Sequence, residues 1–213
     1  MSPLALPRSP GRPKGADSSC YDGLLTAALS SFACHGFDGV SLRTIANAAG
    51  FNVSMVSHYF GSKIGLWQAV VDTIAQDHQD TLLERLRVLN APARPLATRL
   101  GDVLDVLLDR LGERPEIIMF VTREISDPGE RLDYLVERLL RPGVEVCVPL
   151  WNEAMDAGLL RRVNPVIFHM GLFGSLAMIL ASRPIVARLG GGDMGIEQLK
   201  AEIHRGLNLG QFI

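Results

Sequence analysis

Three glycines, Gly36, Gly50 and Gly61, divide the first third of the chain into short segments, and this division constrains the fold more than any other feature. Within each segment apolar residues recur three or four positions apart, which is the period of an α-helix. Glycine commonly ends a helix because it adopts the left-handed conformation that a helix C-terminus favours. The helices predicted from this pattern are 18–35, 41–49 and 53–60.

The second and third of these segments predict a helix-turn-helix unit. Ser41 and Asn52 stand where N-terminal caps are expected, and Gly50 supplies the tight turn between the helices. Val56 and Phe60 lie four residues apart and are expected to bury the back of the third helix. A helix-turn-helix places its second helix in the major groove of DNA, although a small helical domain of another function can show the same pattern.

The other positions of the third helix predict a face directed toward DNA. Their side chains are short or polar enough to meet base edges and phosphates. These positions are Val53, Ser54, Ser57, His58 and Tyr59. Tyr59 also fits a partly buried position, and this alternative remains open.

The run from Leu24 to Lys63 resembles the N-terminal domain of the TetR family of transcriptional regulators. The shared features are a double alanine, a phenylalanine and Gly-Phe in the first helix and its end, then S-L-R-x-I-A-x-x-A-G, then H-Y-F-G-S-K. With Gly65 and Leu66 the ending resembles a subgroup that carries a Y-x-F-G-x-K-x-G-L segment. Ser57 departs from the family pattern because it stands where a tyrosine is usual.

The resemblance implies roles for individual side chains. Arg43, at the start of the second helix, would reach a base edge or a phosphate. Lys63 would open a fourth helix, whose free backbone N–H groups and dipole favour a phosphate. The side chains that would lie along the major groove are Ser54, Ser57, His58 and Tyr59. A solvated arginine and a solvated lysine are the alternatives at positions 43 and 63.

Residues 1–16 are rich in proline and glycine, and they predict a flexible basic arm. Arg12 lies within Pro-Gly-Arg-Pro-Lys, and an arginine on an extended backbone fits the narrow minor groove of A·T-rich DNA. A plain disordered tail is the alternative. Residues 1–63 carry five basic and three acidic side chains, against sixteen and twenty in the remainder, so the basic part coincides with the predicted DNA-binding end.

The rest of the chain predicts helices throughout, so the expected fold class is all-α. A long helix is expected over 63–89, followed by a break at 90–95. The later helices are expected at 96–111, 116–125, 130–140, 143–157, 165–181 and 195–209, with a hinge at Arg141–Pro142. The predicted domains are the arm at 1–16, a helix-turn-helix DNA-binding domain at 17–62, and an effector-binding and dimerisation domain at 63–213.

The interior of residues 63–213 is rich in methionine and aromatic side chains, which adapt to apolar ligands. The resemblance implies an effector site here, and we expect a small, mostly apolar effector. The residues expected to hold it are Phe120, Trp151, Met155 and Phe168. Core packing alone is the alternative explanation for these side chains.

Small residues recur along 165–181, and they allow a second helix to approach closely. With the last helix this segment is expected to form half of a four-helix interface in a homodimer, although packing within one chain explains it as well. The expected interface residues are Met170, Gly174, Ala177, Leu199 and Ile203. The function expected is that of a ligand-responsive repressor that binds a pseudo-palindromic double-stranded DNA operator.

Other functional classes find little support in the sequence. Cys20, Cys34 and Cys147 form no C-x-x-C pair, which disfavours a disulfide scaffold or a structural zinc site and fits a reducing cytoplasm. The most apolar run, 166–181, is shorter than the roughly 20 residues that span a bilayer, so a buried helix is expected there.

The chain shows no catalytic motif, and its five histidines have no metal-ligand partner at helical spacing. We therefore expect no enzyme activity, no cofactor and no metal. The alternatives are a redox- or metal-responsive regulator that uses Cys34–His35 or Cys147, and a small helical enzyme.

Overall fold

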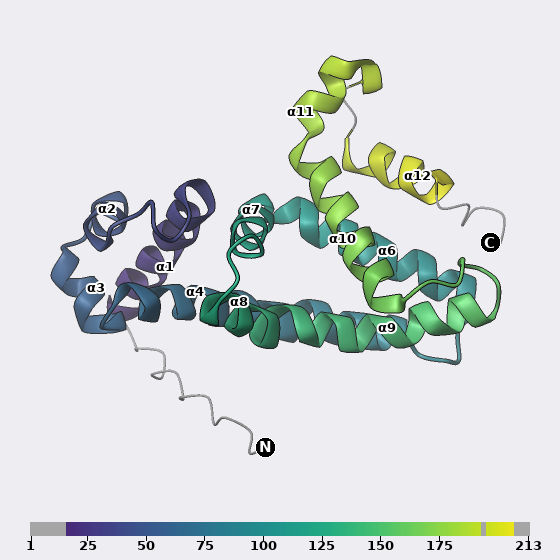
Figure 1. The fold of residues 1–213 in the computed structure, drawn as a ribbon, viewed down its shortest axis with the longest axis horizontal. Helices are drawn as coiled ribbons and strands as arrows, with labels where there is room; N and C mark the ends of the chain where they lie inside the picture. The colour runs from purple at the N-terminus through teal and green to yellow at the C-terminus, as the bar shows by residue number, and fades with distance from the viewer. Residues whose placement is uncertain (1–15, 193–194, 207–213) are drawn as a thin grey trace. The chain divides into compact units, whose positions relative to one another are not determined.

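The computed structural model describes residues 16–192 and 195–206, and every regular element within them is a helix (Figure 1). The expected all-α fold class is confirmed. The chain divides into two compact units, Met1–Thr73 and Ile74–Ile213. The division falls inside a helix, ten residues beyond the start of that helix at Lys63.

The first unit contains one long helix, two short ones and the first part of a fourth helix. They are α1 (Ala16–His35), α2 (Leu42–Ala48), α3 (Val53–Phe60) and α4 (Lys63–Asp77). The two expected caps are confirmed, because Ser41 Oγ accepts from the Thr44 N–H at 3.1 Å and Asn52 Oδ1 accepts from the Ser54 N–H at 2.9 Å. Gly50 has φ +76°, a left-handed conformation that lets the chain turn between α2 and α3.

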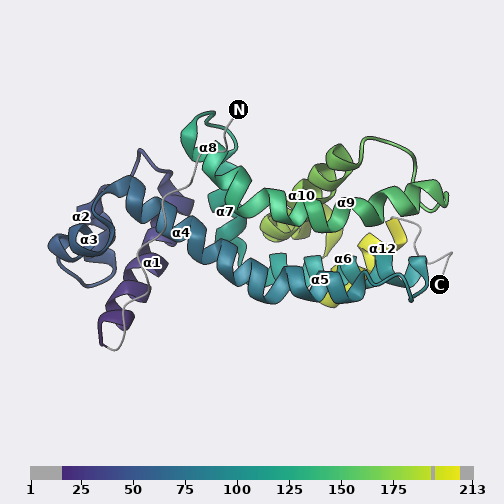
Figure 2. The same cartoon turned by 90° about the horizontal axis from the view of Figure 1, so that it is seen from below.

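The core of the first unit lies where these helices meet. Helix α2 packs against both α1 and α3, as Figure 2 shows. Ile45 of α2 and Val56 of α3 are fully buried, and Leu24 and Phe32 of α1 are buried as well. Val56 therefore confirms the expected inner face of α3, whereas Phe60 is only half-buried.

The described part of the second unit is helical, and its π-helical segments are η1, η2 and η3. After α4 its helices are η1 (His78–Leu83), α5 (Glu84–Leu89), α6 (Leu96–Glu113), α7 (Pro115–Glu124), α8 (Glu130–Leu135), η2 (Val136–Leu140), α9 (Arg141–Asp156), α10 (Pro165–Ala181), α11 (Arg183–Val186), η3 (Ala187–Gly191) and α12 (Ile196–Gly206). The expected hinge at Arg141–Pro142 is wrong. Helical structure continues through it, because Pro142 lies in the first turn of α9, where a helix tolerates proline.

The core of the second unit lies between α6, α9 and α10, which contact one another. A polar clamp reinforces it: Arg99 of α6, 3% exposed, donates to both carboxylate oxygens of Glu153 in α9, at 2.9 and 2.6 Å. The same guanidinium donates to Asn90 Oδ1 at 2.9 Å. A charge removed from water needs such partners, so the clamp fixes the spacing of α6 and α9.

Candidate functional site

The outward face of α3 is the first candidate site. Ser54, Ser57 and His58 are exposed there, and Val53 is 40% exposed. Val56 anchors the opposite side of the same helix in the core. The structure therefore brings the polar residues predicted to meet DNA together on one surface, which is held by a buried residue and a capped N-terminus.

Tyr59 differs from its neighbours because its ring is half-buried. The ring meets Tyr21 of α1 edge-on, with centroids 5.8 Å apart, and Tyr21 also stacks on Phe60 at 4.9 Å. Such pairs stabilise the contact of α3 with α1 beyond the area that they bury. Tyr59 thus occupies a partly buried position, which the sequence left as one of two alternatives.

The two predicted cationic contacts lie in different environments. Arg43 is exposed on the first turn of α2 and makes no ion pair within residues 16–192 and 195–206. Lys63, the first residue of α4, places its ammonium 4.5 Å from the centre of the Phe37 ring. This cation–π contact holds the ammonium beside the α4 N-terminus, and the sequence analysis missed it. Arg12 lies outside the described residues.

A cavity of about 230 Å³ lies within the second unit and is the second candidate site. Leucine, isoleucine and valine side chains form most of its wall, and many of them come from α5, α6, α7 and α9. The π-helical turns η1 and η2 also contribute, and α10 closes one side. Among the described residues its polar lining consists of His78, Thr122, Cys147 and His169, and no Lys, Arg, Asp or Glu of that part of the chain lines it.

His169 accepts a side-chain hydrogen bond at the cavity wall. The indole Nε1–H of Trp151 donates to its Nδ1 at 3.2 Å. Since the indole nitrogen is only a donor, Nδ1 must be unprotonated and the ring proton of the neutral form must be on Nε2. Burial lowers the pKa of His169 to about 4, so the imidazole is neutral near pH 7.

The other titratable groups of the lining are neutral as well. Burial lowers the pKa of His78, whose Nδ1 is inaccessible to solvent and has no hydrogen-bond partner in the described part of the chain. Burial raises the pKa of the Cys147 thiol to about 12. A thiol of that kind is protonated near neutral pH, which argues against Cys147 as a reactive sensor.

The four side chains expected to hold an effector do not line this cavity. Phe120 and Trp151 are fully buried in the core, Met155 is buried, and Phe168 packs against Trp151 with ring centroids 5.4 Å apart. Their large apolar surfaces are already covered by neighbouring helices, as the core-packing alternative stated. Trp151 still acts on the cavity through its hydrogen bond to His169.

The residues expected at a dimer interface separate into two groups. Met170, Gly174 and Ala177 lie on α10 at the cavity wall, where Met170 and Gly174 are also exposed, and a methyl group added at Gly174 would meet no atom within 4 Å. Leu199 is instead buried, on a helix (α12) that contacts α6 of the same chain. The side chain of Ile203 lies outside the described set.

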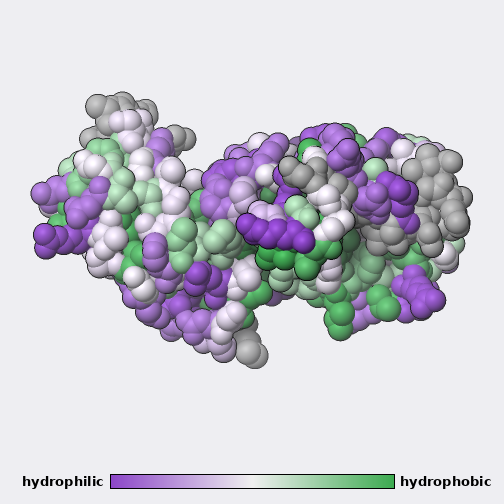
Figure 3. Space-filling model, turned by 90° about the horizontal axis from the view of Figure 1, so that it is seen from above, coloured by the Kyte–Doolittle hydropathy of each residue, from purple (hydrophilic) through white to green (hydrophobic). Residues whose placement is uncertain are grey.

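Several large apolar side chains of α10, α11 and η3 are exposed. They are Val166, Ile167, Met170, Met178, Ile185 and Leu189. Figure 3 views the molecule from the side on which α11 lies in Figure 1, and apolar atoms gather on the surface of the second unit in that view. A surface patch of this kind commonly marks an interface.

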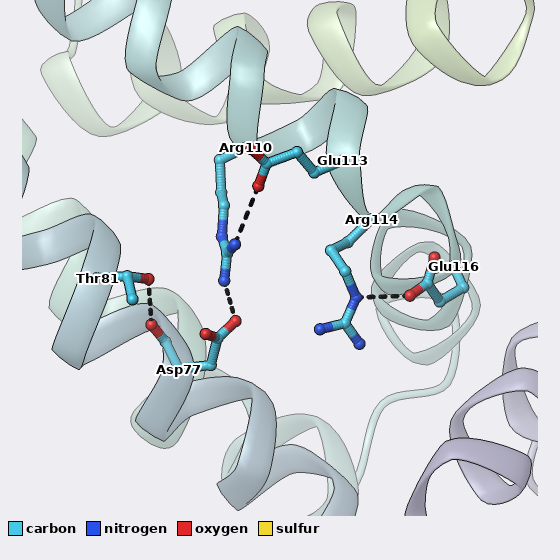
Figure 4. A network of polar contacts seen from close by, with 6 residues as sticks. All are labelled: Asp77, Thr81, Arg110, Glu113, Arg114 and Glu116. Carbon is cyan, nitrogen blue, oxygen red and sulfur yellow. Dashed lines mark hydrogen bonds and ion pairs between the residues drawn. The ribbon is translucent and has the colours of Figure 1, made fainter.

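An ion-pair network lies at the end of α4, next to the cavity residue His78 (Figure 4). The Asp77 carboxylate accepts from Arg110 of α6, and Arg110 also donates to Glu113 at 3.1 Å. Thr81 Oγ1 donates to the Asp77 carbonyl at 2.5 Å. The last residue of α4 is therefore tied to α6 directly before η1 begins.

The described residues bear on metal binding and on membrane insertion. No group of three His, Cys, Asp or Glu side chains there is arranged to hold a metal ion. No single helix among the described residues is long and apolar enough to cross a bilayer. The segments Pro165–Ala181 and Arg183–Gly191 have sufficient length and apolar composition only when taken together, and the chain bends by 67° between them.

Comparison with known proteins identifies the first unit. Residues 24–70 match the family model described as "Bacterial regulatory proteins, tetR family". The chain is 31% identical over 143 residues to the HTH-type transcriptional regulatory protein RaaS of Mycobacterium tuberculosis, covering 67% of this chain and 55% of that protein. It is 28% identical over 108 residues to the probable HTH-type transcriptional regulator YttP of Bacillus subtilis, covering 51% of each. The chain thus matches about half the length of these curated relatives.

Solved structures share the fold. The structure of AibR in complex with isovaleryl coenzyme A and operator DNA has a TM-score of 0.67 at 19% identity, covering 86% of this chain and 95% of that one. The structure of FadR from Bacillus subtilis in complex with stearoyl-CoA has a TM-score of 0.63 at 14% identity, covering 88% and 97%. At these identities the likeness establishes the all-helical fold alone.

Proposed function

We propose that this chain is a ligand-responsive transcriptional repressor that binds a pseudo-palindromic double-stranded DNA operator as a homodimer. The observation that carries the proposal is the exposed polar face of α3, formed by Ser54, Ser57 and His58. This face lies within the residues that match the TetR-family model. A helix-turn-helix reads DNA with such a face in the major groove.

Three further contacts belong to the proposal. Arg43 reaches a base edge or a phosphate from the exposed side of α2, and Lys63 meets a phosphate beside the N-terminus of α4. Arg12 enters the minor groove from the arm at 1–16. Residues 17–62 then read DNA, and residues 63–213 bind the effector and the second copy. The segment ending in Gly65–Leu66 supports the proposal that the chain belongs to the Y-x-F-G-x-K-x-G-L subgroup, and we propose that the protein acts in the cytoplasm.

Helix α4 connects the two activities in sequence. It begins at Lys63 in the DNA-binding part and ends at Asp77, and η1, which follows, contributes His78 to the cavity wall. A ligand that changes η1 therefore acts on the helix that carries a DNA contact at its other end. Ligand binding lowers operator affinity, and by linkage operator DNA lowers ligand affinity by the same factor.

The exposed apolar side of α10 is the proposed contact between two copies. Ile167, 70% exposed, lies on this side and does not line the cavity. Ile167→Glu should convert the dimer to monomers in light scattering, because two like charges would face each other at a two-fold interface. Val163→Glu, in the loop before α10, is the matched control. A dimer of unchanged size in the Ile167 variant would contradict this interface.

Operator binding itself tests the proposal. Footprinting on the DNA that flanks the coding region locates the operator, and anisotropy titration compares this operator with a scrambled duplex of equal length. The expected specific binding exceeds non-specific binding by about 10³-fold or more. Equal affinity for both duplexes would reject the proposal. Binding that is lost on alkylation of Cys34 would favour the redox-responsive alternative.

A further inference from the structure

The wall of the cavity within the second unit restricts what it can bind. Its lining is aliphatic except for His78, Thr122, Cys147, His169 and the ring of Phe173. Within residues 16–192 and 195–206, no Lys or Arg lines it to balance an anion, and no Asp or Glu lines it to balance a cation. Burial of an ionised group without a partner is costly, so an uncharged ligand is favoured.

The wall nevertheless offers a hydrogen-bond donor. Because Trp151 occupies Nδ1 of His169, the ring proton is on Nε2, and this N–H has no hydrogen-bond partner in the portion of the chain that the structure describes. His169 is only 4% exposed, so the cavity is the space in which that N–H can find an acceptor. Water can reach this N–H, so a ligand carbonyl would take the place of a water molecule as its acceptor.

We propose that the cavity binds an uncharged, largely aliphatic molecule that presents a carbonyl oxygen to the Nε2–H of His169. This inference deepens the proposed function and rests on it, since it names the chemical class of the effector. Esters, thioesters, ketones and amides all present this carbonyl acceptor. A free carboxylate has the oxygen but also a charge that the wall does not balance.

The remaining polar groups fit this assignment. The Thr122 hydroxyl already donates to the Ile118 carbonyl within α7, at 2.8 Å. The Nδ1 of His78 is inaccessible to solvent, so it does not contact the ligand and His169 supplies the hydrogen bond. The cavity volume of about 230 Å³ is slightly below the ~300–1,000 Å³ that is usual for small-molecule sites, so a small ligand is expected.

Two isomers provide the test. Methyl heptanoate and octanoic acid have the same atoms, but only the acid is ionised at pH 7.5. Calorimetric titration of the full-length protein with each isomer should show at least about tenfold tighter binding of the ester. Equal affinities, tighter binding of octanoate, or no binding of either isomer would overturn the proposal. This comparison needs no variant of the protein.

Variants then test the role of His169. His169→Phe keeps a ring but removes the N–H, and it should weaken methyl heptanoate binding about tenfold while octanoate binding changes little. Thr122→Val is the matched control on the same wall, and it should preserve the ratio of the two affinities. An unchanged affinity for the ester in a folded His169→Phe protein would contradict the assigned hydrogen bond.

Different measurements test the ligand class and the proposed function, so one proposal can be rejected while the other stands. Operator binding by the ligand-free protein measures the proposed function without any ligand. Specific operator binding without preference for the ester would reject the ligand class alone. Loss of operator affinity on addition of methyl heptanoate, absent with octanoate at equal concentration, would support both.

Discussion

The face of α3 and the cavity of the second unit are assembled in different ways. The α3 face consists of residues within six positions of one another on a single helix, and its shape follows from one cap and one buried valine. The cavity takes its wall from helices across the second unit, and its two histidines are far apart in the sequence. One surface depends on local hydrogen bonds, whereas the other depends on tertiary packing.

The largest expected effect tests whether the α3 face depends on its single anchor. Val56→Asp places an unpaired charge at a fully buried position and should lower the free energy of unfolding by about 4 kcal/mol. Urea unfolding followed by circular dichroism measures the loss. Val53→Asp, on the exposed side of the same helix, should change stability little.

The same variant compares the two units. In a Trp67→Phe background Trp151 is the only tryptophan and reports the second unit alone. Its emission should remain that of a buried indole while the first unit of the Val56→Asp protein unfolds. A shift to the emission of an exposed indole would show that the cavity depends on the first unit.

The next effect concerns the neutral histidine of the cavity. The pKa of His169 is lowered from 6.5 to about 4, so the unfolded chain binds a proton at a higher pH than the folded chain does. The contribution of neutral His169 to the free energy of unfolding is fully present above pH 6.5 and is lost as the pH falls toward 4. The loss is about 3 kcal/mol, because one pKa unit corresponds to about 1.36 kcal/mol. His169→Gln should remove this part of the pH dependence, which urea unfolding at a series of pH values measures. If the free energy of unfolding falls equally with pH in both proteins, the assignment to His169 is wrong.

Arg43 tests the specificity of the DNA-reading surface. Arg43→Ala should cost about 2 kcal/mol of operator affinity if the guanidinium pairs with a guanine. The loss should be concentrated at one base pair in each half-site, as titration of operator variants would reveal. A uniform loss over all variants would instead make Arg43 a backbone contact.

Lys63 has the smallest expected effect. Lys63→Ala should weaken binding to all DNA sequences similarly and reduce the slope of log K against log salt concentration by about one. An unchanged slope would leave the Phe37 contact as the only role of this lysine. Phe37→Leu, which keeps the lysine but removes the ring, separates the two roles.

The same contrast explains what could be predicted from the sequence. Ser41, Asn52 and Gly50 fix their helix ends through hydrogen bonds and backbone angles that involve near neighbours, so the pattern of residues was sufficient. The helix at 165–181 was predictable for the same reason, because Asn164 caps it and Pro165 begins it. DNA contacts of individual side chains remain predictions.

The cavity could not be predicted in this way. Large aromatic residues indicated an apolar interior, but whether a side chain fills the core or faces a cavity depends on how helices pack. Neither His78 nor His169 has a metal-ligand partner at helical spacing, so the sequence pattern predicts no site for them. Packing nevertheless brings both to one cavity wall. A histidine inside an otherwise apolar helix, such as His169 in α10, was the available signal.

The π-helical turn η1 has a geometric consequence for α4. A π turn accommodates one more residue per turn than the α-helical hydrogen-bond pattern. Replacing η1 by α-helical turns would advance the helix by one residue, which corresponds to about 100° of rotation and about 1.5 Å of rise. Such a change would therefore rotate α4 relative to α5 about the helix axis. His78 is the first residue of that turn and also lines the cavity. A ligand in the cavity therefore lies beside the turn that sets this rotation.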